Sequence, residues 1–382
     1  MTDAPPDAAR DPRTDQPIVG VVGAGVMGTG IAQVALEAGH EVVLHDVDDA
    51  ALARGRDRVA DGLARRAART VPDPADIDAW VAARLDRLRG TEVLEQLGDE
   101  ADVVIEAALE SLELKTTIFR TLDAVADPAT ILATNTSALS IAAIAGATSH
   151  PERVVGLHFF NPAPLMALVE VVAGPRTDAA VVSAAESLVA GWGKTAVRCR
   201  DSPGFIVNRV NRPFTLGALR LLEAGVATVD EIDRAMRDAG FPLGPFELMD
   251  LTGIDVTFAA STAIWERLGR PDRLRPSPIQ ERLIAAGHLG RKTGEGFHLY
   301  PGPGAARDRE AGADGERGEA TAASIADPAR IRSAILDAID AEARLVADEG
   351  VASEADIDLA MRLGANHPVG PFERARTREV GP

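Results

Sequence analysis

The chain has 382 residues, of which 46% are hydrophobic and 26% charged, and its formal net charge is −18 at pH 7. This length allows two or three domains with separate cores. The acidic excess argues against nucleic acid and anionic membranes as general partners, because both require a basic surface. No apolar run approaches the roughly 18 residues that span a membrane. With Cys199 as the lone cysteine, we expect a cytoplasmic globular protein in which residues 1–16 form a disordered tail rather than a signal peptide.

A strand, a glycine-rich turn and a helix follow one another near the start of the chain. The apolar run 18–22 leads into Gly23-Ala24-Gly25-Val26-Met27-Gly28, and a helical pattern then continues to Gly39. In this setting GxGxxG is typical of a dinucleotide site: the first glycine permits the turn, the second admits a pyrophosphate, and the third allows close helix packing. The next strand, 41–45, ends at Asp46. A carboxylate there binds the ribose 2′-hydroxyl and repels a 2′-phosphate, so the pattern predicts NAD rather than NADP.

Strands and helices keep alternating through residue 200. Apolar strand patterns recur at 102–107, 130–134, 154–172 and 195–199, separated by helical patterns at 50–69, 77–88 and 178–191. This alternation predicts an α/β fold with a doubly wound sheet over residues 17–200. Polar residues follow two of the strands, where ligands of such sheets bind: Glu110, Lys115, Asn135, Thr136 and Ser137.

The stretch 154–172 reads as a hairpin with a turn at 161–164. His158 falls near the end of its first strand and Glu170 inside its second, so the carboxylate can reach one imidazole nitrogen. That arrangement suits a proton-transfer enzyme, because a histidine with an ordinary pKa near 6.5 can accept a proton around neutral pH. The alternative is a satisfied, half-buried histidine and a glutamate on a wet strand face.

Four arginines share one stripe of the predicted helix 50–69, namely Arg54, Arg58, Arg65 and Arg69. Leu52, Val59 and Leu63 occupy a different face, as expected for an amphipathic helix. An acidic protein that aligns arginines in this way can present them to phosphates. A solvated helix face is an equally good interpretation.

The second half of the sequence reads as helices and contains a partial repeat. The order found at 224–247, ending in Gly-Pro-Phe-Glu, returns at 349–373, and the second copy then breaks off. We divide the helical part into a substrate and dimerisation domain at 201–300, a flexible linker at 301–327 and a truncated second copy at 328–382 that packs on the first.

Taken together, the motifs resemble those of the NAD-dependent (S)-3-hydroxyacyl-CoA dehydrogenase family, often described as 3-hydroxybutyryl-CoA dehydrogenases. The resemblance runs from about 17 to 300 and rests on the glycine fingerprint, 135–137, His158-Phe159-Phe160-Asn161-Pro162, Glu170 and 201–209. It implies a Rossmann-like domain followed by an all-α domain. It also implies catalytic or substrate-binding roles for His158, Glu170, Ser137 and Asn208, and NAD contacts at Gly23, Gly25, Val26, Met27, Gly28, Asp46, Glu110, Lys115, Asn135, Ser137, Asn161 and Lys292.

The resemblance further implies reversible oxidation of an (S)-3-hydroxyacyl-CoA by NAD in fatty-acid metabolism such as β-oxidation, and a homodimer formed through the helical domain. Relatives often hold CoA with a serine and a lysine in the helix after the second strand, and this chain has arginines there instead. We therefore assign CoA binding to Arg58, Arg65 and Arg69. The seven histidines show no metal-ligand spacing, so no metal is expected.

Two other functions are compatible with the same residues. One is a β-hydroxyacid dehydrogenase that acts on a free 3-hydroxy acid with a lysine base. The other is a non-catalytic NAD-binding protein that serves as a structural element or a sensor.

Overall fold

The structure is a computed structural model that describes residues 16–300 and 326–380. It divides into two compact units, one extending to Ala196 and the other beginning at Val197. Most of the expected N-terminal tail and of the expected linker lies outside the described residues.

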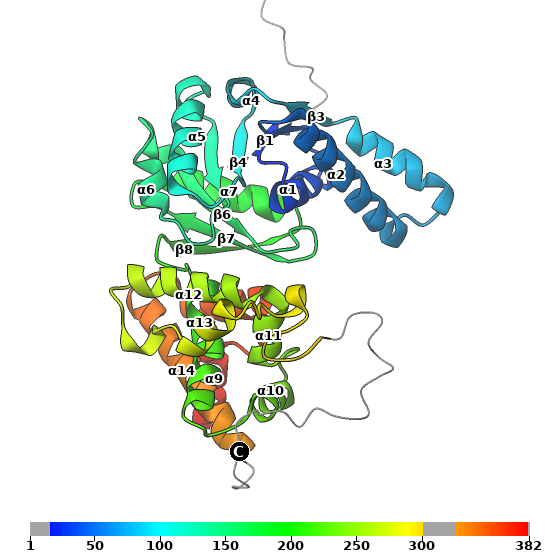
Figure 1. Ribbon diagram of the computed structural model, residues 1–382. Coiled ribbons are helices and arrows are strands. Elements are labelled where there is room, and N and C mark those ends of the chain that lie inside the picture. Colours follow the sequence, from blue (N-terminus) through cyan, green and yellow to red (C-terminus); the bar gives the residue numbers. More distant parts are fainter. Residues whose placement is uncertain (1–15, 301–325, 381–382) are drawn as a thin grey trace, which may run out of the picture. The chain divides into compact units, whose positions relative to one another are not determined.

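The first unit is built on one mostly parallel sheet (Figure 1), with the strands in the order β3-β2-β1-β4-β5-β6-β7-β8. Strands β1 to β6 pair in parallel, and β7 pairs antiparallel with β6. The order 3-2-1-4-5-6 is that of the Rossmann fold, so the predicted fold class is confirmed. The strand bounds are β1 Val19–Val22, β2 Val42–His45, β3 Leu88–Thr91, β4 Val103–Glu106, β5 Ile131–Thr134, β6 Val154–Phe159, β7 Leu168–Ala173 and β8 Thr195–Arg200.

Helices cover both faces of this sheet. Val19 and Val21 belong to the core beneath α1 and α7, whereas a Cβ at Gly20 would meet Leu97 of α4 at 2.8 Å, on the opposite face. This alternation is the period of two expected of a strand. The helices are α1 Val26–Glu37, α2 Asp49–Thr70, α3 Ile77–Leu85, α4 Leu94–Glu100, α5 Leu112–Val125, α6 Ile141–Ala145 and α7 Ala179–Gly191.

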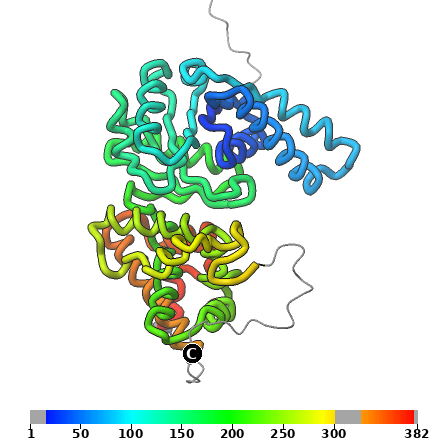
Figure 2. The backbone as a smooth tube through the Cα atoms, in the orientation of Figure 1, coloured from blue at the N-terminus to red at the C-terminus, as the bar shows by residue number. Residues whose placement is uncertain are grey.

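Helices α2 and α3 form an arm that extends beyond the sheet (Figure 2). The side chain of Asp48 caps α2 by accepting a hydrogen bond from Ala50 N, and Gly55 packs against Ala24 of the glycine turn. The predicted helix 77–88 is too long, because α3 ends at Leu85 and β3 follows at once.

The second unit is helical, and the sequence repeat is visible in its hydrogen bonds. Asp233 of the first copy accepts from Phe246 N and Glu247 N, and Asp358 of the second accepts from Phe372 N and Glu373 N. Equivalent buried aspartates therefore cap one helix in each copy. The helices are α8 Val207–Val210, α9 Arg212–Glu223, α10 Val229–Asp238, α11 Pro245–Thr252, α12 Ile254–Arg267, α13 Pro278–Ala285, α14 Pro328–Asp348, α15 Glu354–Gly364 and α16 Pro371–Val380.

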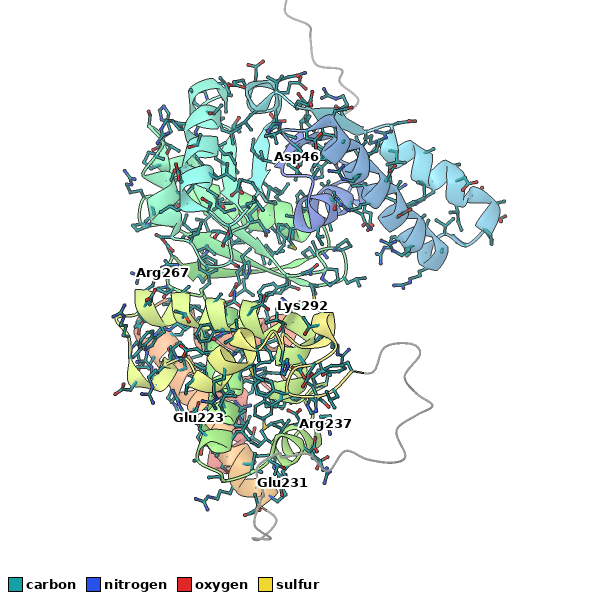
Figure 3. All side chains as sticks on the ribbon, in the orientation of Figure 1. Asp46, Glu223, Glu231, Arg237, Arg267 and Lys292 are labelled. Atoms are coloured by element: carbon teal, nitrogen blue, oxygen red, sulfur yellow. The ribbon has the colours of Figure 1, made fainter. Side chains whose placement is uncertain are left out.

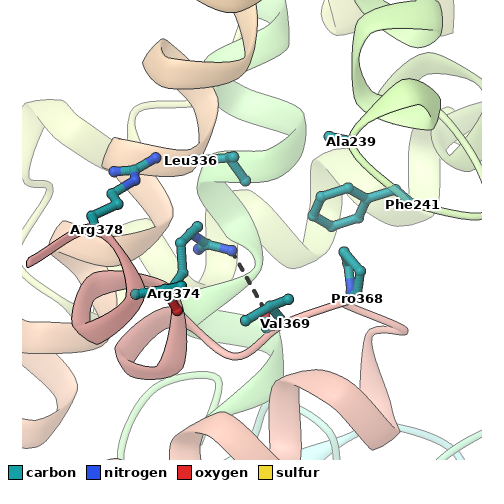
Figure 4. Close-up of a pocket in the computed structure, with 8 residues that line it drawn as sticks. Ala239, Phe241, Leu336, Pro368, Val369, Arg374 and Arg378 are labelled. Atoms are coloured by element: carbon teal, nitrogen blue, oxygen red, sulfur yellow. Dashed lines mark hydrogen bonds between the residues drawn. The ribbon is translucent and has the colours of Figure 1, made fainter. Parts of the chain in front are cut away.

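The second copy packs on the first through α14 and α9. Ile331, Ile335 and Ile339 of α14 recur at helical spacing and are fully buried, or nearly so. A pocket of about 310 Å³ remains between the copies (Figure 4), where Phe241 of the first faces Pro368, Val369 and Arg374 of the second.

Candidate active site

The glycine turn after β1 has the geometry that its sequence predicts. Gly23 adopts φ +104°, a conformation that favours glycine, and a Cβ on Gly28 would lie 1.8 Å from the Gly23 carbonyl oxygen. A Cβ on Gly25 would meet nothing within 4 Å, and Gly25 precedes α1 without a side-chain cap. An open backbone surface therefore lies at the N-terminus of α1, where a pyrophosphate fits.

Asp46 follows the last residue of β2 and faces this turn (labelled in Figure 3). Its Oδ2 accepts a hydrogen bond of 2.8 Å from Ala24 N, while Oδ1 accepts from Val47 N. These bonds fix the carboxylate beside the glycine turn, as required of a residue that binds the adenosine ribose of NAD.

A chain of charged and polar groups lies at the carboxyl ends of β4 and β5. Lys115 is 1% exposed and pairs with Glu106 at 2.6 Å and with Glu110 at 3.4 Å. Thr134 Oγ1 donates to the second Glu106 oxygen. Lys115 thus connects β4 to Glu110, and its predicted contact with NAD remains a prediction.

Glu110 organises the segment that follows β5. Its Oε1 accepts hydrogen bonds from Thr136 Oγ1 at 2.6 Å, Ser137 N at 3.0 Å and Ala138 N at 3.2 Å. Asn135 of the same segment accepts from Phe159 N through Oδ1. The predicted site residues Glu110, Asn135 and Ser137 are therefore brought together, and Asn135 links them to the strand that carries His158.

His158 and Glu170 face each other across the antiparallel pair β6 and β7. His158 Nδ1 lies 2.6 Å from Glu170 Oε2, and the two residues are 5% and 0% exposed. With Nδ1–H donating to the carboxylate, the ring has the tautomer that carries its lone pair on Nε2. The predicted contact between these side chains is confirmed.

Lys194 holds the connection between β6 and β7, where the predicted residue Asn161 lies. Its ammonium donates to the carbonyl oxygens of Ala163, Pro164 and Met166 at 2.7, 3.2 and 2.8 Å. Partial burial lowers the pKa of Lys194. Sequence reasoning missed this residue, because a lysine before a strand carries no local signal of such a role.

Two predicted site residues, Asn208 and Lys292, belong to the second unit. Asn208 lies on the short helix α8, and its carbonyl oxygen accepts from Arg212 Nε at 2.9 Å. Lys292, labelled in Figure 3, pairs with Asp255 at 2.5 Å.

The arginine stripe on α2 does not behave as one group. Arg58 Nη1 donates to the carbonyl oxygen of Ala24 at 2.9 Å, and Arg54 lies 3.9 Å from Asp48. Arg65 and Arg69 are exposed farther along the helix. Arg58 thus supports the glycine turn, which leaves the two distal arginines as the simpler candidates for CoA phosphates.

The described residues contain neither a candidate membrane-spanning helix nor a candidate metal site. No helix in ranges 16–300 and 326–380 is both long and apolar enough to cross a membrane. Within the same ranges, histidine, cysteine, aspartate and glutamate side chains form no group of three or more that could hold a metal ion.

Two family models cover most of the chain. The NAD-binding domain of 3-hydroxyacyl-CoA dehydrogenase matches residues 18–202, and the C-terminal domain of the same enzyme matches 204–300 and 331–380. The second match therefore includes both helical copies.

Curated relatives and solved structures agree with these matches. The 3-hydroxyadipyl-CoA dehydrogenase of Escherichia coli K12 is 39% identical over 93% of this chain and 89% of its own. The mitochondrial hydroxyacyl-coenzyme A dehydrogenase of Rattus norvegicus is 42% identical over 74% of this chain and 90% of its own. The crystal structure of 3-hydroxybutyryl-CoA dehydrogenase from Escherichia coli K12 superposes with a TM-score of 0.83 at 37% identity, covering 95% of this chain and 91% of that one.

Proposed function

The chain belongs to the 3-hydroxyacyl-CoA dehydrogenase family and is an NAD-dependent oxidoreductase, and on this premise we propose that it oxidises an (S)-3-hydroxyacyl-CoA reversibly with His158 as general base. The observation that carries the proposal is the buried His158–Glu170 pair, in the unit that also holds the glycine turn and Asp46. Neither a free hydroxy acid as substrate nor a non-catalytic role is favoured by the matched relatives.

His158 takes the proton of the substrate hydroxyl at Nε2 as the alcohol becomes a ketone. Glu170 holds Nδ1–H and stabilises the imidazolium that forms, as the carboxylate does in a hydrolase triad. Bound NAD would supply the hydride acceptor, so that two electrons leave the carbinol carbon as hydride while the hydroxyl proton goes to His158.

We assign two further polar residues to binding of the substrate. Ser137, held by Glu110, and Asn208 on α8 hydrogen-bond the reacting oxygen or the thioester. Such contacts would hold the substrate in the reactive orientation and so lower the entropic part of the activation barrier. The exposed Arg65 and Arg69 bind the phosphates of CoA.

We place the enzyme in the cytoplasm and in fatty-acid or related acyl-CoA metabolism, including β-oxidation. The lone cysteine, Cys199, is buried and forms no intrachain disulfide, a pattern usual for proteins of reducing compartments. The E. coli relatives are named for adipyl and butyryl substrates, so short linear and dicarboxylic acyl groups are the first to compare.

The assay follows NADH absorbance in purified protein with acetoacetyl-CoA, beside acetoacetate and with NADPH as control. We expect rapid NADH oxidation with the thioester, and little with the free acid or with NADPH. Equal rates with acetoacetate would favour a free hydroxy acid as substrate. NADH binding without turnover of any acyl-CoA in the panel would favour a non-catalytic role.

A further inference from the structure

Arg209, the neighbour of Asn208 on α8, is an arginine with a fully buried side chain. Its Nε donates to Glu342 Oε1 at 2.8 Å, and Nη1 and Nη2 donate to the two oxygens of Glu349 at 2.5 and 2.7 Å. Both glutamates come from the second helical copy, where Glu342 lies on α14 and Glu349 caps it. A buried cation of the first copy is therefore neutralised by the second.

This contact is not a repeated feature of the two copies. When Gly225 is aligned with Gly350 and Asp233 with Asp358, Glu342 falls opposite Gly217 and Glu349 opposite Ala224. On the other side of the α9–α14 contact, a Cβ on Gly217 would lie 3.6 Å from the Ile335 side chain. At equivalent positions of the repeat, the first copy therefore has small residues that allow close helix packing, and the second copy has the glutamates that pair with Arg209.

The charges are arranged so that Arg209 depends on these acids. Burial disfavours its charge, but the hydrogen bonds of Glu349 and Glu342 outweigh that effect and raise the pKa of Arg209. The hydrogen bond from Arg209 in turn lowers the pKa of Glu349. Glu342 also pairs with Arg273 at 2.6 Å, so loss of either glutamate leaves two arginines to share one carboxylate, and the buried guanidinium of Arg209 loses part of its hydrogen bonding.

The chain is also hydrogen-bonded to the second copy on both sides of α8, at Arg200 of β8 and at Asn211. Before α8, Arg200 N donates to Val351 O at 2.8 Å, and after it, His367 Nε2 lies 2.9 Å from Asn211 Oδ1. A helix of four residues cannot hold its own position, because most helical stability comes from packing.

We propose that the second helical copy is a positioning element for Asn208, acting through Glu342, Glu349 and the guanidinium of Arg209. The inference rests on the proposed function, in which Asn208 binds the substrate. The truncated copy then affects substrate binding indirectly, by holding Asn208 in place, and does not itself contact the substrate.

The test compares Glu349→Gln and Glu342→Gln with a matched control on the same helix, Asp340→Asn. Asp340 is also buried and ion-paired, but its partner Arg374 belongs to the second copy itself. We expect each glutamate variant to lower kcat/KM for acetoacetyl-CoA about tenfold or more, because small displacements of positioning groups cost that much, with the KM for NADH unchanged. Asp340→Asn should lower the melting temperature and keep kcat/KM within about twofold of the parent.

Two further outcomes would overturn the proposal or its premise. If both glutamate variants lose thermal stability as the control does but keep kcat/KM, the second copy is only structural and the proposal is wrong. If Asn208→Ala itself leaves turnover and thioester KM unchanged, the proposed role of Asn208 fails first. Glu349 is 46% exposed in its side chain, so Glu349→Gln tests the proposal even if Glu342→Gln does not fold, and Glu349→Asp should restore part of the lost activity.

Discussion

A single contact decides how the imidazole of His158 can act. Because Glu170 Oε2 lies 2.6 Å from Nδ1, the ring is oriented and the basic nitrogen is Nε2. The two flanking strand patterns were enough to predict this contact, although the connection between the strands, 160–167, is longer than the predicted turn at 161–164. By contrast, the bonds of Lys194 and Arg209 could not be predicted, because their partners come together only in the folded chain.

The carboxylate of Asp46 is expected to set the choice between NAD and NADP. Asp46→Asn removes its charge and keeps an oxygen that can accept from the Ala24 or Val47 amide. The repulsion of a 2′-phosphate is then lost, and we expect the NADH-to-NADPH ratio of kcat/KM to fall by about tenfold, or roughly 1.4 kcal/mol. Steady-state kinetics with both cofactors measures it, and an unchanged ratio would remove Asp46 from cofactor selection.

The arginines of helix α2 lie in two different environments. Arg58 bonds the glycine turn, whereas Arg65 and Arg69 lie exposed farther along the helix. We expect the double substitution of Arg65 and Arg69 by alanine to raise the KM for the CoA thioester several-fold and to leave the KM for NADH unchanged. Arg58→Ala, the matched control, should instead raise the KM for NADH. The interpretation of the stripe as a solvated face would be correct if the double variant kept its thioester KM.

The stability of segment 294–300, at the end of the first helical copy, depends on the charge of His298. The hydrogen bond that His298 donates to Asp233 raises the pKa of His298 despite partial burial, and Asp230, Asp250 and Tyr300 also lie near the ring. A histidine whose pKa is raised on folding stabilises the fold fully below about pH 6.5, and this stabilisation is lost as pH rises through the folded-state pKa. Burial also raises the pKa of Asp233, which weakens the pair at low pH.

We therefore expect His298→Gln to speed hydrogen exchange in segment 294–300 more at about pH 6.5 than at about pH 9. The second copy offers a control, because Arg376 bonds Asp358 at 3.1 Å in the corresponding place and stays charged throughout. Arg376→Gln should change local exchange by a factor that does not vary with pH. A pH-independent effect of His298→Gln would exclude the charged pair.

Among the elements, apolar periodicity predicted the strands except the edge strand β3, together with α1, α2, α3 and α7, whereas α4 and α6 were missed. The central residues of Leu88–Thr91, Arg89 and Gly90, are exposed, so the strand lacks the apolar run that marks the interior ones. It forms because β2 supplies its hydrogen-bonding partner.

The second helical copy packs against α9 of the first copy through α14. The family resemblance implies dimers formed through the helical domain, yet α14 of the same chain packs on that helix. We expect sedimentation equilibrium to give the mass of one chain at micromolar concentration, because the intramolecular copy has a far higher effective concentration than a second molecule. A stable mass of two chains would show that another surface forms the dimer.

The internal repeat predicted this second copy, since Gly-Pro-Phe-Glu returns in the same order near the C-terminus. Its functional contacts could not be predicted from the repeat, because Glu342 and Glu349 have no acidic counterparts in the first copy. They lie 133 and 140 residues from Arg209. Only the folded arrangement shows that these acids reach the helix of Asn208.

The proton transfer assigned to His158 is tested most directly by single-turnover NADH oxidation with acetoacetyl-CoA in His158→Gln. Binding of NADH, followed by its fluorescence, serves as the control for folding. We expect normal NADH binding and a hydride-transfer rate lower by roughly 10²–10⁴, the scale of a positioned acid or base. A rate near that of the parent enzyme would contradict it.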